Sequence, residues 1–305
     1  MDQSVVTVKN FTKTYGDFVA VDDISFEVQH GEIFGLLGPN GAGKTTTLEC
    51  LEGLRQPDGG EMQITGVDPQ REPSKLRNLI GVQLQTSGLP DNMTVEESLN
   101  IFSAYHGVQP RHELLTRMGL EEKRKTQYHQ LSTGQQRRLS LALALSHDPR
   151  LIILDEPTAG LDVSSRTELH NMMQELKSQG TTLILATHDM AEAEKMTDRV
   201  AILLSGKIVA TGSPRELTAK GSGMTKISVS TEDSILHNNE NTFPAVTQHG
   251  IKEEYSIYFS TDPGPTVSAI LNHLASNNDS LIDLRVERPS LEERFLEITG
   301  NGGTE

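Results

Sequence analysis

A glycine-rich segment, GPNGAGKTT at residues 38–46, has the residue types that bind a phosphate chain. It fits the pattern G-x-x-x-x-G-K-[ST], and it stands between an apolar run typical of a strand and a segment with helical spacing. In such a loop the backbone N–H groups face the phosphates, Lys44 reaches their outer oxygens, and the Thr45 hydroxyl can bind Mg²⁺. A glycine turn with a solvated lysine would have the same letters, but the flanking strand and helix favour a phosphate site.

Two acidic residues end the apolar run LIILDEP at residues 151–157. A buried parallel strand would deliver Asp155 to the carboxyl edge of a sheet, where it can hold Mg²⁺ directly or through water. Glu156 would then orient or deprotonate the attacking water. Two solvated acids at a strand end would look the same in isolation, so it is the phosphate loop that favours these roles.

Three more side chains stand next to expected strands. His188 follows the apolar run TTLILAT, and Gln85 follows IGVQL. Both side chains can polarise water or contact a metal ion without adding negative charge. We expect them to approach the phosphate site, because the ends of neighbouring parallel strands meet at one edge of a sheet. Tyr15 precedes the first pair of strands, where its ring could either stack on a base or pack against the protein.

A second candidate anion site lies in YHQLSTGQQRRLSL at residues 128–141. A serine, a threonine and a glycine precede a run with helical spacing, and the free N–H groups at a helix N-terminus favour bound negative charge. The sequence therefore predicts two anion sites that are far apart along the chain.

The elements that must position these residues follow an α/β pattern. Over the first 213 residues short apolar runs alternate with helical patterns, and the opening is richer in strands. Only helical patterns occur between Thr94 and His147, so we expect a helical subdomain at about residues 86–148, inserted between two strands. A small-residue linker, AKGSGM, marks a domain boundary near Gly221.

The segment after the linker predicts a second, smaller domain. Its pattern is strand, strand, helix, strand, helix, and Ser290 with Glu293 forms a capping box for the last helix. We expect a phosphate-binding α/β domain at residues 1–220 and an α+β accessory domain at residues 221–305. The glutamates of the last helix are expected to form a solvated face without a catalytic role.

Composition excludes several classes of protein. The chain of 305 residues has 35% hydrophobic and 23% charged residues, which is an ordinary globular balance. No window approaches eighteen consecutive apolar residues and the N-terminus lacks a signal-peptide pattern, so we expect no membrane span. The net charge of −15 opposes binding to nucleic acid. The single cysteine, Cys50, cannot form an internal disulfide.

Taken together, the motifs resemble the ATP-binding subunit of an ATP-binding-cassette (ABC) transporter. The resemblance covers residues 15 to about 213 and six motifs in family order. GPNGAGKTT is similar to the Walker A motif, LQTSG to the Q-loop, LSTGQ to the signature, LIILDE to Walker B, AGLD to the D-loop and ATHD to the switch histidine. The segments LEGLRQPDGGE and RPSLEERFLEITG most resemble those of bacterial drug exporters of the daunorubicin-resistance type. Thr133 departs from the commonest signature, which has glycine there, and its side chain would narrow the freedom of the backbone.

The resemblance implies an ABC-type P-loop ATPase core, with a β-rich N-terminal subdomain and an inserted helical subdomain, that uses ATP and Mg²⁺. It assigns catalysis to Glu156, His188 and Gln85, and metal binding to Thr45, Gln85 and Asp155. The residues that it places around the nucleotide are Tyr15, Gly38, Pro39, Asn40, Gly41, Ala42, Gly43, Lys44, Thr45, Thr46, Ser132, Gly134, Gln135 and Asp162.

The two anion sites are explained if the active form is a homodimer. If the helical subdomain carries LSTGQ away from the phosphate loop, two copies related by a twofold axis can bring both sites onto one γ-phosphate. By the resemblance, Ser132 and the Gly134 amide of one copy close over the ATP held by Lys44 of the other. Hydrolysis would remove this bridge and open the dimer.

The resemblance also implies a partner and a location. The chain would be the motor of an exporter of drugs or other hydrophobic compounds, bound to a separately encoded transmembrane permease through the Q-loop and the helical subdomain. It would then be cytoplasmic, peripheral on the inner face of the cell membrane. Two alternatives are a soluble ABC ATPase that acts on ribosomes or DNA, and the motor of an importer. The single phosphate loop and the negative charge disfavour the first, and no nucleic-acid partner is expected.

Overall fold

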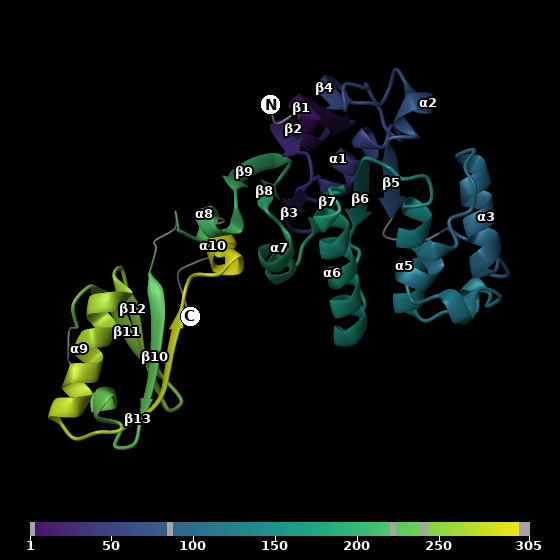
Figure 1. Cartoon of the computed structure of the whole chain (residues 1–305). Coiled ribbons are helices and arrows are strands. Elements are labelled where there is room, and N and C mark those ends of the chain that lie inside the picture. Colours follow the sequence, from purple (N-terminus) through teal and green to yellow (C-terminus); the bar gives the residue numbers. More distant parts are fainter. Residues whose placement is uncertain (1–3, 84–87, 220–223, 239–242, 299–305) are drawn as a thin grey trace. The chain divides into compact units, whose positions relative to one another are not determined.

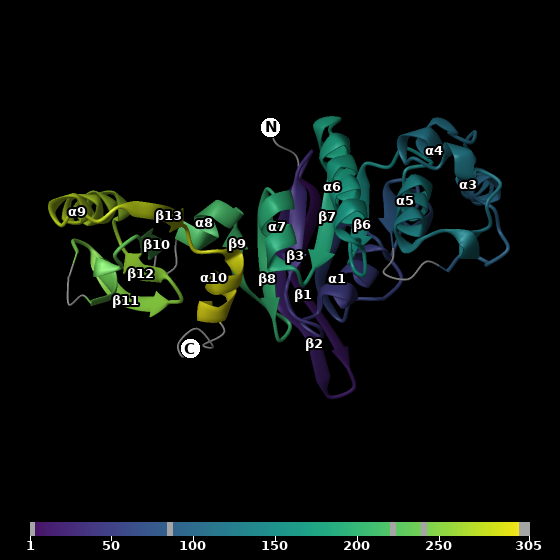
Figure 2. The same ribbon diagram turned by 90° about the horizontal axis from the view of Figure 1, so that it is seen from below.

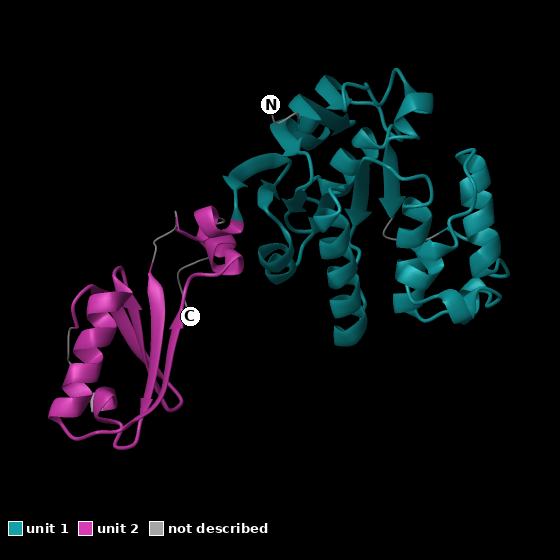
Figure 3. Ribbon diagram, viewed as in Figure 1, with its two compact units in different colours: residues 1–213 teal, residues 214–305 magenta. Residues whose placement is uncertain are grey.

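The computed structural model describes residues 4–83, 88–219, 224–238 and 243–298. It divides the chain into two compact units, residues 1–213 and 214–305 (Figure 3). The division falls before the expected boundary near Gly221, because helix α8 (Pro214–Ala219) contacts helix α10 (Leu291–Ile298) of the second unit. Gln85 lies outside the described residues.

A six-stranded sheet forms the centre of the first unit, with strand order β5-β6-β7-β3-β8-β9 (Figure 1). Five strands are parallel, and β9 pairs antiparallel with β8 at one edge. Three of the four inner strands, β3, β6 and β7, are buried along their whole length, which explains their continuous apolar sequences. The bounds are β3 Ile33–Leu37, β5 Ile80–Gln83, β6 Leu151–Asp155, β7 Thr182–Thr187, β8 Arg199–Leu204 and β9 Lys207–Gly212.

A second, three-stranded antiparallel sheet has the order β2-β1-β4. Its strands are β1 (Ser4–Tyr15), β2 (Phe18–Gln29) and β4 (Gly59–Ile64). A hydrophobic core fills the space between this sheet, the central sheet and helix α1 (Lys44–Leu51). The apolar run ISFEV predicts only the second half of β2. The strand begins earlier because its pairing with β1 continues toward the hairpin turn, with an irregularity near Asp23, which has a φ of 54°.

The opposite face of the central sheet carries a second core that is shared with the helices. Helices α6 (Val163–Ser178) and α7 (Met190–Met196) cover this face (Figure 2). Next to them lies the predicted helical subdomain, whose described residues form helices, turns and an isolated bridge. Its helices are α3 (Val95–Tyr105), α4 (Glu113–Arg117) and α5 (Thr133–Ala144), with 3-10 turns at Glu121–Lys123 and Tyr128–Gln130; the short helix α2 (Pro73–Leu76) precedes β5.

The second unit contains a four-stranded antiparallel sheet with the order β11-β12-β10-β13. Helix α9 (Pro263–Ser276) packs on one face through a small core, and a 3-10 turn spans Ile235–Asn238. The strands are β10 (Thr225–Thr231), β11 (Val246–Lys252), β12 (Tyr255–Ser260) and β13 (Leu281–Glu287). The predicted capping box is confirmed, since Ser290 Oγ accepts from the Glu293 amide at 3.1 Å and a Glu293 carboxylate oxygen accepts from the Ser290 amide at 2.9 Å.

Strand β11 was absent from the sequence prediction. It lies at an edge of the sheet, and almost all of its residues are exposed, so it has no alternation of apolar and polar side chains. Among the residues that the structure describes, no helix combines the length and the apolar character that crossing a membrane requires.

Candidate functional site

The loop between β3 and α1 wraps around the amino group of Lys44. Lys44 Nζ donates to the carbonyl oxygens of Gly38 at 2.8 Å and Pro39 at 3.3 Å, and it lies 3.7 Å from Glu156 Oε1. The side chain is only 6% exposed. Burial lowers the pKa of Lys44, and the carboxylates of Glu156 and Asp155 oppose that shift. The loop therefore holds a desolvated cation at the N-terminus of α1, where it can bind phosphate oxygens.

Two glycines of the loop are required by its geometry. Gly38 has a φ of 151°, and a Cβ there would lie 2.3 Å from the carbonyl oxygen of Leu203. Gly43 has a φ of 104°, and its Cβ would lie 2.7 Å from the carbonyl oxygen of Ala20. Both distances are far below van der Waals contact, so any side chain would push the loop away from its neighbours.

Thr45 and Asp155 form a pair with the donor chemistry of a magnesium site. Thr45 Oγ1 donates to Asp155 Oδ2 at 3.1 Å. Asp155 Oδ1 is buried and has no hydrogen-bond partner among the described residues. Burial raises the pKa of Asp155, against the effect of the Thr45 hydrogen bond. A hydroxyl oxygen beside a carboxylate with one unshared oxygen fits Mg²⁺, which prefers oxygen ligands.

Glu156 and His188 are brought together by the register of β6 and β7. Asp155 pairs with Ala186, so the residues that follow each strand leave the sheet at the same edge. His188 Nδ1 lies 2.9 Å from both carboxylate oxygens of Glu156. Glu156 itself is buried and has a φ of 49°, and its amide donates to the Ala186 carbonyl at 2.9 Å. The imidazole and Lys44 therefore fix the carboxylate from two sides.

A pocket of about 190 Å³ joins this site to the β1–β2 hairpin. Its lining residues are Tyr15, Phe18, Ala20, Asn40, Gly41, Gly43, Lys44, Thr45, Thr46 and Glu156. The Tyr15 ring has Lys13 Nζ at 5.5 Å and the Arg55 guanidinium at 5.4 Å from its centre. Phe18, 60% exposed, was not among the residues predicted for the site. The sequence does contain a signal for it: the two-residue turn Gly16-Asp17 pairs Phe18 directly with Tyr15, so a hairpin prediction would have placed Phe18 beside Tyr15.

The predicted residues of the signature and D-loop do not line this pocket. Ser132 and Gln135 are engaged in a capping box at the start of α5, with distances of 3.2 Å and 3.0 Å. Asp162 caps α6 by accepting from the Ser165 amide at 3.0 Å and hydroxyl at 2.7 Å, and these bonds lower its pKa. A Cβ on Gly134 would lie 2.6 Å from the Ser165 hydroxyl oxygen, so the two helix starts are closely packed.

Thr133, where the commonest signature has glycine, causes no backbone strain. It is the first residue of α5, it is exposed, and it is not among the residues with positive φ. A helical φ is open to any residue, so the backbone conformation at this position does not require glycine.

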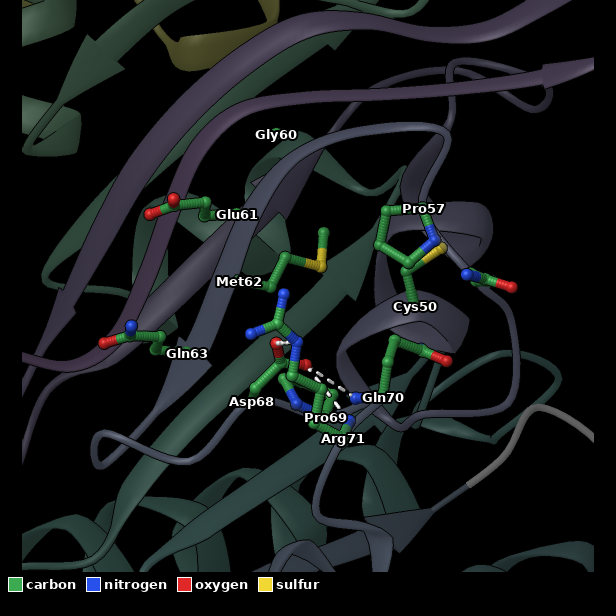
Figure 4. A pocket seen from close by; sticks show the side chains of 11 residues that line it. Cys50, Pro57, Gly60, Glu61, Met62, Gln63, Asp68, Pro69, Gln70 and Arg71 are labelled. Atoms are coloured by element: carbon green, nitrogen blue, oxygen red, sulfur yellow. Dashed lines mark hydrogen bonds and ion pairs between the residues drawn. The ribbon is translucent and has the colours of Figure 1, made fainter.

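Another pocket, of about 280 Å³, lies between α1 and β4 (Figure 4). Asp68 binds the backbone of its own loop: it accepts from the N–H groups of Gln70 at 2.9 Å and Arg71 at 3.3 Å. Burial raises the pKa of the Cys50 thiol to about 11, so the thiolate that a nucleophile needs is scarce at neutral pH. This pocket offers no reactive group.

Two further hollows meet along the seam between the core and the helical subdomain. One has a volume of about 430 Å³ and the other about 660 Å³, and both are lined by Glu52, Leu54, Val82, Phe102, Tyr105 and Leu143. We call the two together the seam groove. Leu54, Ile101 and Tyr105 are each more than half exposed at its rim. A continuous apolar surface of this kind is typical of a contact with another protein.

Known proteins share both the sequence and the fold of this chain. Residues 21–159 match the family model described as ABC transporter. The Nod factor export ATP-binding protein I of Cupriavidus metallidurans is 36% identical over 97% of this chain and 98% of its own length. The linearmycin resistance ATP-binding protein LnrL of Bacillus subtilis is 32% identical over 97% of this chain and 98% of its own length.

The solved structures that are similar to this chain are also ATP-binding cassettes. A structure titled as the ATP binding subunit of an ABC transporter matches with a TM-score of 0.67 and 29% identity, over 72% of this chain and 94% of that chain. The ADP conformation of MJ1267, an ATP-binding cassette of an ABC transporter, matches with a TM-score of 0.64 and 25% identity, over 70% and 92% of the two chains. The chain therefore belongs to the ABC transporter family, as an ATP-binding subunit with ATPase activity.

Proposed function

We propose that this chain is the motor of an exporter and drives a separately encoded transmembrane permease. The observation that carries the proposal is the convergence of Lys44, the Thr45–Asp155 pair and the Glu156–His188 pair beside one pocket. These groups have the chemistry that hydrolysis of a nucleoside triphosphate requires: a cation for the phosphates, oxygen ligands for a metal and a positioned base.

In this mechanism each side chain has a separate task. Lys44 and the N–H groups of the loop at residues 38–46 bind the β- and γ-phosphates. Thr45 and Asp155 would hold Mg²⁺, which would supply positive charge beside the phosphate oxygens. Gln85, outside the described residues, is proposed as a further ligand. Glu156 takes the proton of the attacking water.

Two aromatic residues and one histidine complete the proposed site. The ring of Tyr15 stacks on the base, with Phe18 beside it on the hairpin. His188 keeps the Glu156 carboxylate in place, since its Nδ1 lies 2.9 Å from both oxygens. It can also contact the γ-phosphate once ATP is bound.

We further propose that the ATP-bound form is a homodimer. Ser132 and Asp162 are exposed and belong to helix starts outside the lining of the Lys44 pocket, which supports a role toward a second copy. In a twofold dimer, the Ser132 hydroxyl and the Gly134 amide of one copy meet the γ-phosphate on Lys44 of the other, with Gln135 beside them.

Export through a permease is supported by the relatives and by the seam groove. The names of two relatives, which cover 97% of this chain, refer to Nod factor export and linearmycin resistance. The groove, on the seam beside the helical subdomain, is the surface proposed to bind the permease and so to keep the chain at the inner face of the membrane. Residues 221–305 are proposed as an accessory domain for dimer contacts or regulation.

The test is to co-express the chain with any multi-span membrane protein encoded next to it in the genome. The two should co-purify, and the complex in vesicles should hydrolyse ATP and accumulate a hydrophobic drug in an ATP-dependent way. A Glu156→Gln complex should assemble and not transport. Co-purification with ribosomes in place of a membrane protein would contradict the proposal.

A further inference from the structure

Among the described residues that line the seam groove, Gln83 is a fully buried polar side chain without a hydrogen-bond partner. Gln83, the last residue of β5, is 1% exposed and lines the larger hollow. Neither Nε2 nor Oε1 of its amide has a hydrogen-bond partner within the described part of the chain. An unsatisfied buried amide is costly, because it has lost its water without gaining a protein partner. It needs both a donor and an acceptor from outside the chain.

A carboxylate stands in the same groove. Glu52 caps the C-terminal end of α1 and lines both hollows. Its side chain has no hydrogen bond or ion pair to any described residue. Burial, Asp155 and Glu49 together raise the pKa of Glu52 to about 7. Arg77 lines the far part of the groove but lies over the Tyr105 ring, 4.9 Å from its centre.

These two groups set the chemistry of whatever covers the groove. The walls and rim are apolar, so the occupant must present apolar side chains to Phe102, Ile101 and Leu143. At the floor it must supply a positive charge for Glu52 and a hydrogen-bonding group for Gln83. An arginine or lysine on an amphipathic segment supplies the donors: its stem packs on apolar surface while its head binds the Glu52 carboxylate and donates to Gln83 Oε1. A backbone carbonyl of the same segment is the acceptor for Gln83 Nε2.

We propose that Glu52 and Gln83 form a recognition pair for a basic side chain on the permease segment that docks in the seam groove. The inference rests on the proposed function, because it takes the permease as the occupant. The pair selects the partner: a segment without a basic residue would leave a carboxylate and an amide buried and unpaired. The apolar rim supplies contact area, and the pair supplies specificity.

The experiment compares complexes formed by full-length variants with the membrane protein encoded beside this chain. Glu52→Lys should reduce co-purification at least about tenfold, because it sets like charges against each other in a poorly hydrated site. Glu122→Lys is the matched control, since this exposed acid lies on the helical subdomain and does not line the groove. Changing the Lys and Arg residues of the permease's loops to Glu, one at a time, should identify one position that restores assembly with Glu52→Lys.

A second variant guards against a folding defect. Gln83→Met keeps the length of the side chain and removes both unpaired atoms. It should raise the Tm of the isolated chain by about 2–4 °C while weakening the complex several-fold. A lower Tm would show that the amide is satisfied in the isolated chain, which overturns the inference.

The outcomes separate the inference from the proposed function. If the wild-type chain captures its permease but Glu52→Lys and Glu122→Lys bind it equally well, the recognition pair is wrong and the motor function stands. If all variants bind ATP but no permease changes restore assembly with Glu52→Lys, the partner residue is not basic and the inference fails. If the wild-type chain captures no permease, the proposed function itself fails.

Discussion

Replacing Glu156 by glutamine should separate nucleotide binding from hydrolysis. The amide has the same shape as the carboxylate and can still accept a hydrogen bond from His188 Nδ1, which now lies 2.9 Å from both oxygens. The strain of the positive φ at this position, 49°, is the same in the variant, because Gln and Glu both carry a Cβ. The variant therefore keeps its fold and loses mainly the group that takes a proton.

The size of the effect follows from that loss. A positioned general base contributes roughly 10²–10⁴-fold to a rate, so hydrolysis should slow by at least about 10²-fold, which corresponds to about 2.7 kcal/mol in the activation free energy. ATP affinity should not fall. The 3.7 Å ion pair between Glu156 and Lys44 disappears in the variant, which leaves the lysine free to bind phosphate.

The assay is single-turnover phosphate release at saturating ATP, paired with binding of a fluorescent ATP analogue. Glu122→Gln, at an exposed position of the helical subdomain, serves as the control for the removal of one negative charge. A rate within about threefold of the wild type would remove Glu156 from the role of the base. A matching loss of ATP affinity would instead mean that the carboxylate serves binding.

Three further predictions concern the phosphate loop and the dimer. Lys44→Ala should raise the Kd for ATP at least about tenfold, because it removes the buried cation. The measurement is a titration with the same fluorescent analogue, and an unchanged Kd would mean that the loop binds phosphate without the lysine. A mixed dimer of Lys44→Ala and Ser132→Arg chains should recover about half of the wild-type ATPase activity per dimer, because one of its two sites carries neither lesion; no recovery in isolated heterodimers would point to a site built within one chain or to strict coupling. Gly38→Ala should lower the Tm by several degrees more than Gly41→Ala, since only the first Cβ meets the Leu203 carbonyl, at 2.3 Å, while the second faces open space; equal melting curves would refute the steric argument.

The residues around Lys44 could be predicted to lie together because their signals are local. The phosphate loop needs glycines at fixed offsets, and β6 and β7 are continuous apolar runs that end in Asp155-Glu156 and just before His188. Parallel pairing then brings the strand ends together, so a one-dimensional pattern was enough to place Glu156 near the histidine. The distance of 2.9 Å between His188 Nδ1 and the Glu156 carboxylate is set in a backbone where Glu156 has a positive φ, and no sequence pattern predicts that φ.

The recognition pair in the groove could not be predicted in the same way. From the sequence, Gln83 is a polar residue at the end of a short strand. Because β5 is an edge strand, such a residue would be expected to face water. It is buried because α5, far along the chain, packs against β5. Phe18 and β11 were missed for the opposite reason: both are exposed, and burial is what gives a strand its pattern.

The position of β3 in the sheet has a consequence for biosynthesis. This strand leads into the phosphate loop, yet its two neighbours are β7 and β8, and the amide of Ile33 donates to Asp198, which lies 165 residues later in the chain. At roughly 5–20 residues per second, a ribosome needs on the order of 10–30 s to make the missing neighbours. Over that interval the nascent chain carries an apolar strand with both edges unpaired, so we expect chaperones that bind extended apolar segments to hold it before the nucleotide site can form.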